Sequence, residues 1–147
     1  PEVLTDCTAD IAMLLLLGVS RRASEGEFHV RKKEWSGWRP THMMGTKVTG
    51  KTLGLVGMGR IAQAVAHKAH FGFNMKILFF DPYFNNNDII KKFNAVPCKT
   101  LDDLLKDSDF VSLQASHILL ATFTASPITV NSTLSSLPTL PTKHGPK

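Results

Sequence analysis

Three glycines interrupt an apolar run just before a stretch of small and apolar residues. The segment reads GLVGMGRIAQAVA and extends from Gly54 to Ala66. A short apolar run of this kind predicts a strand buried on both faces, and the stretch after it predicts a helix. Glycine allows backbone conformations that other residues avoid, and it lets other groups approach the backbone closely. The sequence therefore predicts a strand, a tight turn and a helix in direct succession.

The residues that follow repeat this alternation of strand and helix. MKILFFD, AVPC and DFVSL predict further strands, and NNNDIIKKFN and TLDDLLKDS predict the helices between them. Thr100 can cap the last of these helices, with Asp102 and Asp103 in its first turn. Repeats of this length favour parallel strands joined by right-handed crossovers. We therefore expect an α/β fold with an incomplete, Rossmann-like parallel sheet flanked by helices.

The segments on either side of these repeats have a different character. Residues from about Thr8 to Trp35 predict one long helix, which Thr8 or Asp10 can cap and which EWSGWRPTHMMG ends. Trp35 and Trp38 in that irregular segment indicate packing against either the domain core or a partner element or subunit. Residues 114–147 are rich in Ser, Thr and Pro and predict an irregular tail. The predicted organisation is a folded domain over residues 1–113 followed by this tail.

Composition narrows the class of protein. Hydrophobic residues make up 43% of the chain, which excludes disorder throughout, and no apolar run is long enough to span a membrane. Cys7 and Cys98 lack metal-binding spacing and predict reduced, half-buried thiols. With no basic leader at the first residues, we expect a cytoplasmic protein without a membrane partner. The net charge is +5, which we interpret as solvated helix surface rather than a nucleic-acid site, because no reader motif accompanies it.

The pattern Gly57-x-Gly59-x-x-Ala62 meets the requirements of a dinucleotide site. The first glycine permits the tight turn, the second lets the backbone approach a pyrophosphate, and a small third residue allows close packing of helix and strand. The start of the helix offers free N–H groups to the phosphates, and Arg60 adds a positive charge. Glycine turns also arise for packing alone, so the motif by itself leaves both interpretations open.

An acidic residue at the end of the next strand favours a dinucleotide site over a turn that exists for packing alone. Asp81 follows the turn by about 20 residues, where a carboxylate can accept hydrogen bonds from both hydroxyls of an adenosine ribose and would repel a 2′-phosphate. The alternative interpretation is that Asp81 serves only as a turn residue before Pro82. Together the strands, turn, helix and acid favour dinucleotide binding, with NAD preferred over NADP. A methyltransferase uses similar elements, but this glycine spacing and Arg60 suit a pyrophosphate better.

The segments VLTDCTADIAMLLLLGVSRR, GKTLGLVGMGRIAQAVAHKAHFGFNMKILFFDP and LDDLLKDSDFVSL resemble the D-isomer-specific 2-hydroxyacid dehydrogenase family. The resemblance implies that residues 1–113 form an incomplete NAD-binding domain. It implies hydride transfer between NAD and the C2 carbon of a small 2-hydroxy or 2-keto acid in the full-length protein. It also implies a set of cofactor-binding residues, namely Thr8, Gly57, Met58, Gly59, Arg60, Ile61, Asp81 and Pro82.

The same resemblance bears on catalysis and assembly. The family polarises its substrate with an arginine and moves a proton with a histidine paired with an acid, but no arginine follows Arg60 and no Asp or Glu follows Asp109. We therefore assign no catalytic residue and expect the isolated chain to be inactive. The family resemblance also predicts a homodimer, formed through the long helix predicted from about Thr8 and the segment with Trp35 and Trp38. The alternative is an NAD-responsive dimeric binding module of the corepressor type.

Overall fold

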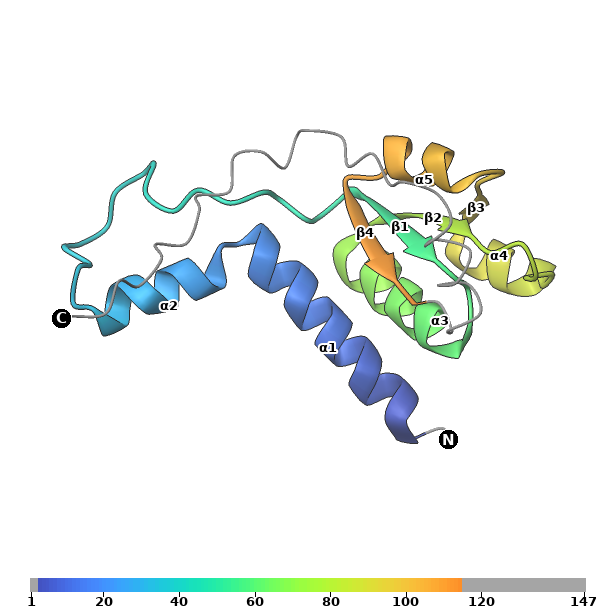
Figure 1. The fold of residues 1–147 in the computed structure, drawn as a ribbon, viewed down its shortest axis with the longest axis horizontal. Coiled ribbons are helices and arrows are strands. Elements are labelled where there is room, and N and C mark those ends of the chain that lie inside the picture. The colour runs from blue at the N-terminus through green and yellow to red at the C-terminus, as the bar shows by residue number, and fades with distance from the viewer. Residues whose placement is uncertain (1–2, 115–147) are drawn as a thin grey trace, which may run out of the picture. The chain divides into compact units, whose positions relative to one another are not determined.

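The computed structural model describes residues 3–114, which lie within one compact unit of the chain. The predicted tail therefore lies, apart from Gln114, outside the described residues. The elements are labelled in Figure 1 and alternate between helix and strand after residue 51. They are α1 (Val3–Ser20), α2 (Ala23–Arg31), β1 (Thr52–Val56), α3 (Arg60–His67), the π-helical turn η1 (Lys68–Gly72), β2 (Lys76–Phe80), α4 (Asn87–Phe93), β3 (Val96–Pro97), α5 (Leu101–Asp107) and β4 (Phe110–Leu113).

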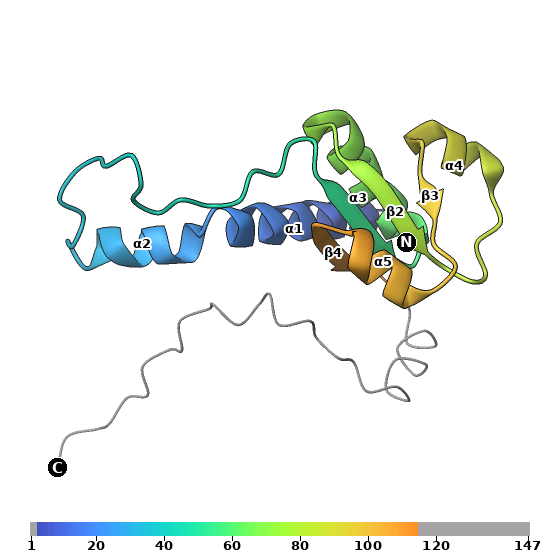
Figure 2. The same cartoon turned by 90° about the horizontal axis from the view of Figure 1, so that it is seen from above.

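All strand pairs in the sheet are parallel, and the strand order is β3-β2-β1-β4. In the register, Leu53 of β1 pairs with Ile77 of β2 and with Phe110 of β4. Helix α3 lies on one face of the sheet with α1 beside it, and α5 covers the other face (Figure 2). The predicted α/β class and Rossmann-like parallel sheet are confirmed, as are the strands in the three clear apolar runs.

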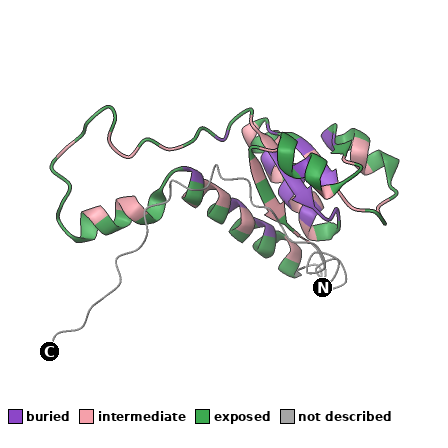
Figure 3. Ribbon diagram, turned by 45° about the horizontal axis from the view of Figure 1, so that its top comes forward, coloured by how far each residue is buried: buried purple, intermediate pink, exposed green. Residues whose placement is uncertain are grey.

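The core lies between β1, β2 and α3 (Figure 3). Leu53 and Leu55 are two residues apart on β1, so both side chains point toward this face, and both are fully buried. The buried residues Ala62 and Val65 of α3 belong to the same core. Burial of apolar side chains of this size contributes about 1.5–3 kcal/mol each. On the opposite face Gly54 has almost no free space, because a Cβ there would collide with Ser108 Oγ and approach Leu104 Cδ2 to 2.7 Å. This close approach of α5 explains a glycine inside a strand.

Local hydrogen bonds secure the later helices and strands. The predicted cap at Thr100 is present as a capping box, in which Thr100 Oγ1 accepts from Asp103 N–H and the Asp103 carboxylate accepts from Thr100 N–H. Asp109 fastens β4 to β1, because its Oδ2 accepts from Thr52 N–H at 2.9 Å and its Oδ1 from Lys51 Nζ at 3.1 Å. The Thr52 hydrogen bond first, and Lys51 second, hold the pKa of Asp109 below its usual value.

The prediction of one helix from Thr8 to Trp35 is wrong. The chain breaks between α1 and α2, and Arg22 adopts a left-handed conformation with φ 54° and ψ 40°. The cause is a long-range contact: Ser20 O accepts the N–H of Thr46 at 2.8 Å instead of an amide one turn further along the helix. The carbonyl that would have continued the helix is thus occupied by the chain returning toward β1.

Two expectations about side-chain burial also need correction. Trp35 and Trp38 are 57% and 82% exposed, so they do not cover the core of the described domain. Cys7 is exposed, although Cys98 is half-buried as predicted. The exposure of Cys7 follows from α1, which buries Ala9 and Met13 against the core and leaves its opposite side open. No helix among residues 3–114 combines the length and apolar content needed to cross a bilayer.

Candidate dinucleotide site

The carboxyl ends of β1 and β2 lie side by side. Val56 and Phe80 are paired in the parallel register, so the residues after them, Gly57 and Asp81, leave the sheet at the same edge. Gly57 N–H donates to Phe80 O at 2.9 Å, which extends the ladder by one bond. In open parallel sheets this edge is where ligands bind. The sheet therefore brings the glycine turn and the predicted acidic residue together.

The turn has the backbone geometry that its glycines allow. Gly57 has a φ of 92°, a left-handed value that residues other than glycine rarely adopt. Gly59 is instead extended, with φ −71° and ψ −174°, and stands at the N-cap of α3. A Cβ built on Gly59 meets no atom of residues 3–114 within 4 Å. Gly57 is thus required by conformation, whereas the backbone at Gly59 is left uncovered by its own domain.

The start of α3 is open to an acceptor from outside. Within the described part of the chain no side chain caps α3. Its first internal hydrogen bond runs from Gln63 N–H to Gly59 O, at 2.9 Å. The amides of Arg60, Ile61 and Ala62 precede that bond, as at every helix start. These amides and the helix dipole place partial positive charge at this point. The arrangement suits an anion such as a phosphate.

The carboxylate of Asp81 is held by the turn itself. Its Oδ2 accepts from Met58 N–H at 2.9 Å and its Oδ1 accepts from Tyr83 N–H at 3.0 Å. A carboxylate has about four acceptor positions, so each oxygen retains one for a hydroxyl from outside. Asp81 is half-buried. Its orientation is therefore fixed before any ligand is present, and it also acts as the turn residue that the alternative interpretation expected.

The other predicted residues occupy different positions around the turn. Met58 presents only its backbone, since its side chain is fully buried. Ile61 is half-buried and packs against the core, while Arg60 and Pro82 are exposed. Thr8 is exposed on α1, where its hydroxyl donates to Leu4 O at 2.7 Å, and no described contact joins it to the turn.

Sequence reasoning missed one residue at the turn. The Nε2 of Gln63 donates to Met58 O at 2.9 Å, from a position one turn into α3. The sequence signal was only a polar residue in a stretch of small and apolar ones, RIAQAVAH. A half-buried amide in such a place needs a partner, and here the partner is the Met58 carbonyl of the turn.

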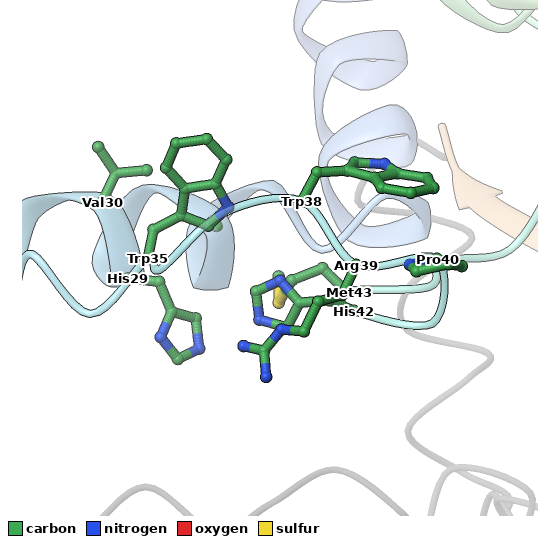
Figure 4. Close-up of a pocket in the computed structure, with 9 residues that line it drawn as sticks. His29, Val30, Trp35, Trp38, Arg39, Pro40, His42 and Met43 are labelled. Atoms are coloured by element: carbon green, nitrogen blue, oxygen red, sulfur yellow. The ribbon is translucent and has the colours of Figure 1, made fainter.

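A cavity of about 370 Å³ lies elsewhere, between α2 and the segment that follows it (Figure 4). None of the residues predicted to bind the cofactor lines it. Its walls come from Gly26, His29, Val30, Trp35, Trp38, Arg39, Pro40, His42 and Met43. No group of three or more His, Cys, Asp or Glu side chains suited to a metal ion occurs among residues 3–114.

The parallel sheet, the glycine turn, the uncapped helix start and the strand-end acid define a Rossmann-type dinucleotide-binding domain. Residues 13–120 match the sequence model described as D-isomer specific 2-hydroxyacid dehydrogenase, NAD binding domain. The chain belongs to this family, and NAD is the cofactor of such domains. The family assignment favours neither the methyltransferase nor the corepressor-type alternative.

Particular relatives agree with the family. The chain is 45% identical over 115 residues to a glycerate dehydrogenase of Hyphomicrobium methylovorum, covering 78% of this chain and 35% of that protein. It is 44% identical over 117 residues to a glyoxylate reductase of Pyrococcus horikoshii, covering 77% and 34%. The structure resembles a glyoxylate reductase from Paecilomyes thermophila with a TM-score of 0.67 and 32% identity, covering 79% and 33%. The chain thus spans about a third of the length of these proteins.

Proposed function

We propose that the turn from Gly57 to Gly59 and the start of α3 bind the pyrophosphate of NAD, while Asp81 binds the hydroxyls of the adenosine ribose. The observation that carries this proposal is the uncovered backbone at Gly59, next to a carboxylate that already has a fixed orientation. NAD supplies the hydride chemistry when bound, and the protein positions it. The residues present therefore fit this cofactor.

Further residues have distinct proposed roles. The exposed guanidinium of Arg60 forms a charge-assisted contact with a phosphate oxygen. Ile61 contributes its backbone amide at the helix start, and Met58 contributes the amide that orients Asp81. Pro82 restricts the backbone directly after Asp81. Thr8 remains a proposed cofactor contact on the basis of the family resemblance alone.

The proposed discrimination between NAD and NADP rests on Asp81. Its carboxylate accepts hydrogen bonds from a 2′-hydroxyl, but a 2′-phosphate would bring two negative groups together. Both carboxylate oxygens are already tethered to backbone amides, so the side chain cannot easily turn away from the phosphate. We expect NAD to bind more tightly than NADP.

The proposed activity of the full-length protein is oxidation or reduction at the CH–OH group of a small 2-hydroxy acid in the cytoplasm. The proposed reaction follows from the family and from relatives named glycerate dehydrogenase and glyoxylate reductase, and the proposed location is the expectation from the sequence. The chain as printed is proposed to bind NAD without turnover, because no arginine follows Arg60 and no Asp or Glu follows Asp109. Loss of NADH absorbance in the presence of glyoxylate or hydroxypyruvate would contradict this part of the proposal.

Assembly into a homodimer is also proposed, through one side of α1 and the segment after α2. Apolar side chains spaced four residues apart share a side of a helix. Ile11, Leu15 and Val19 follow that spacing, Leu4 lies seven residues before Ile11 on the same side, and all four are exposed. We call these residues, together with Trp35 and Trp38, the α1–tryptophan surface. Exposed apolar side chains that share one side of a helix are typical of a protein interface.

The test of cofactor binding uses Gly59→Val and calorimetric titration with NAD. Gly59 has a φ that valine tolerates and no neighbour within 4 Å, so we expect an unfolding free energy within about 0.5 kcal/mol of the wild type. The valine side chain fills the space above the turn, so NAD binding should be lost. Gly72→Ala, also at a glycine without neighbours, is the matched control and should bind normally. Wild-type affinity in Gly59→Val would refute the proposed site.

A further inference from the structure

We infer that Gln63 is a positioning residue for the dinucleotide, one that fixes the direction of the Gly59 amide through the Met58 carbonyl. The inference rests on the proposed function, since it concerns how the same turn is prepared for a pyrophosphate. Gln63 itself lies one turn into α3 and is half-buried. Its role is exerted through the backbone of the turn.

Gln63 secures two consecutive carbonyls of the glycine turn. Its side-chain Nε2 donates to Met58 O at 2.9 Å, and its backbone N–H donates to Gly59 O at 2.9 Å. From the other side, Met58 N–H donates to Asp81 Oδ2 at 2.9 Å. The peptide groups before and after the Met58 Cα are therefore each held by one hydrogen bond. Gln63 holds the later one, which joins Met58 to Gly59.

The orientation of that peptide group decides what the turn offers to a ligand. In a trans peptide the C=O and the following N–H point in opposite directions, and the described residues contain no cis peptide bond. With Met58 O directed toward the Gln63 side chain, Gly59 N–H must point away from it. Glycine places little steric restriction on rotation of the neighbouring peptide group. Without Gln63, the group can turn and direct a carbonyl oxygen where the N–H had been.

The chemistry of the side chain matters as well as its length. Glutamine provides an uncharged N–H donor, which a carbonyl acceptor requires. Methionine has a similar size but no donor. Glutamate has the same shape, but it would place a carboxylate beside Met58 O and near the proposed phosphates. The two replacements therefore separate loss of the hydrogen bond from added negative charge.

The test combines calorimetric titration with NAD and amide NMR of the chain without ligand. For Gln63→Met we expect affinity for NAD to fall about tenfold, the factor that one hydrogen bond commonly provides. The Gly59 amide resonance should shift or broaden, while that of Gly54 within β1 stays in place. Gln63→Glu should reduce the affinity further, and its deficit should shrink at high salt because charge repulsion is screened.

The control is Thr100→Ala, which removes the capping box of α5 on the other face of the sheet. It should lower the urea midpoint at least as much as Gln63→Met does, yet leave NAD affinity and the Gly59 resonance unchanged. Wild-type affinity and an unmoved Gly59 resonance in Gln63→Met would overturn the inference while leaving the proposed function intact. Failure of the wild-type chain to bind NAD would instead refute the proposed function, and the inference with it.

Discussion

One carboxylate, that of Asp81, organises the turn and has a second, proposed role in binding NAD. It organises the backbone by accepting from Met58 and Tyr83 amides, and it keeps acceptor positions free for a ligand. A side chain that already satisfies backbone donors loses little conformational entropy when a ligand arrives. The same two bonds make the residue sensitive to substitution, because removing the carboxylate leaves a turn amide without its partner.

The first prediction concerns this carboxylate. Asp81→Ala should weaken NAD binding by about 10- to 100-fold, since hydrogen bonds to charged groups contribute about 1.5–3 kcal/mol. Asp81→Asn keeps one acceptor oxygen but removes the charge, so it should lose less affinity for NAD and raise the affinity for NADP relative to NAD. Titration of both variants with both cofactors measures this. An unchanged NAD affinity in Asp81→Ala would show that the ribose does not bind here.

Positions that depend on the order of strands and helices could be predicted from the sequence, and those that depend on distant contacts could not. Gly57 and Asp81 meet at one edge of the sheet because each follows a strand of the repeat, and their contacts with NAD stay a prediction. Gln63 was not, because its partner becomes apparent only when the turn closes over α3. The burial of the Met58 side chain was likewise invisible, since an apolar residue in a turn gives no sign of which way it points.

At the scale of elements, the short strands and the capped helices were predicted more accurately than the long first helix. β1, β2 and β4 coincide with continuous apolar runs, and α5 begins where the capping residues predict it. The break between α1 and α2 has no glycine or proline to signal it. It depends on Ser20 O accepting from Thr46 N–H, a contact between residues far apart in the chain. The change from α3 into the π-helical turn η1 was also not predictable, because the helical composition continues through it.

The break itself supports a prediction at Arg22. A left-handed conformation costs a residue with a Cβ about 1 kcal/mol, whereas glycine adopts it freely. Arg22→Gly and Arg22→Ala both remove the exposed ion pair with Glu25, so comparison of the two variants isolates the backbone cost. The free energy of unfolding in urea should be about 1 kcal/mol higher for Arg22→Gly than for Arg22→Ala. Equal stability of the two variants would mean that α1 and α2 are not separated at this residue in solution.

At the scale of the whole molecule, the described residues leave two apolar surfaces uncovered. One is the α1–tryptophan surface. The other is on β4, where Val111 and Leu113 are exposed on the face that α5 covers only in part. Trp35 and Trp38 of the first surface line the cavity between α2 and the segment after it, where a side chain from a second copy has room to enter. The exposed apolar residues along one side of α1, together with this cavity at the tryptophans, are why we place the dimer contact there rather than on β4.

The last prediction concerns that dimer. Sedimentation equilibrium should give twice the chain mass for the wild type and the monomer mass for Leu15→Lys, because a lysine buried in an apolar contact without a partner is strongly unfavourable. Val111→Lys makes the same change on β4 and should remain dimeric. Trp35 and Trp38 are the two tryptophans of the chain, so their fluorescence reports on this surface directly. Their emission should move to longer wavelength in Leu15→Lys as water reaches the indoles. If Val111→Lys dissociates the dimer while Leu15→Lys does not, the copies associate through β4 and the α1–tryptophan surface is not the interface.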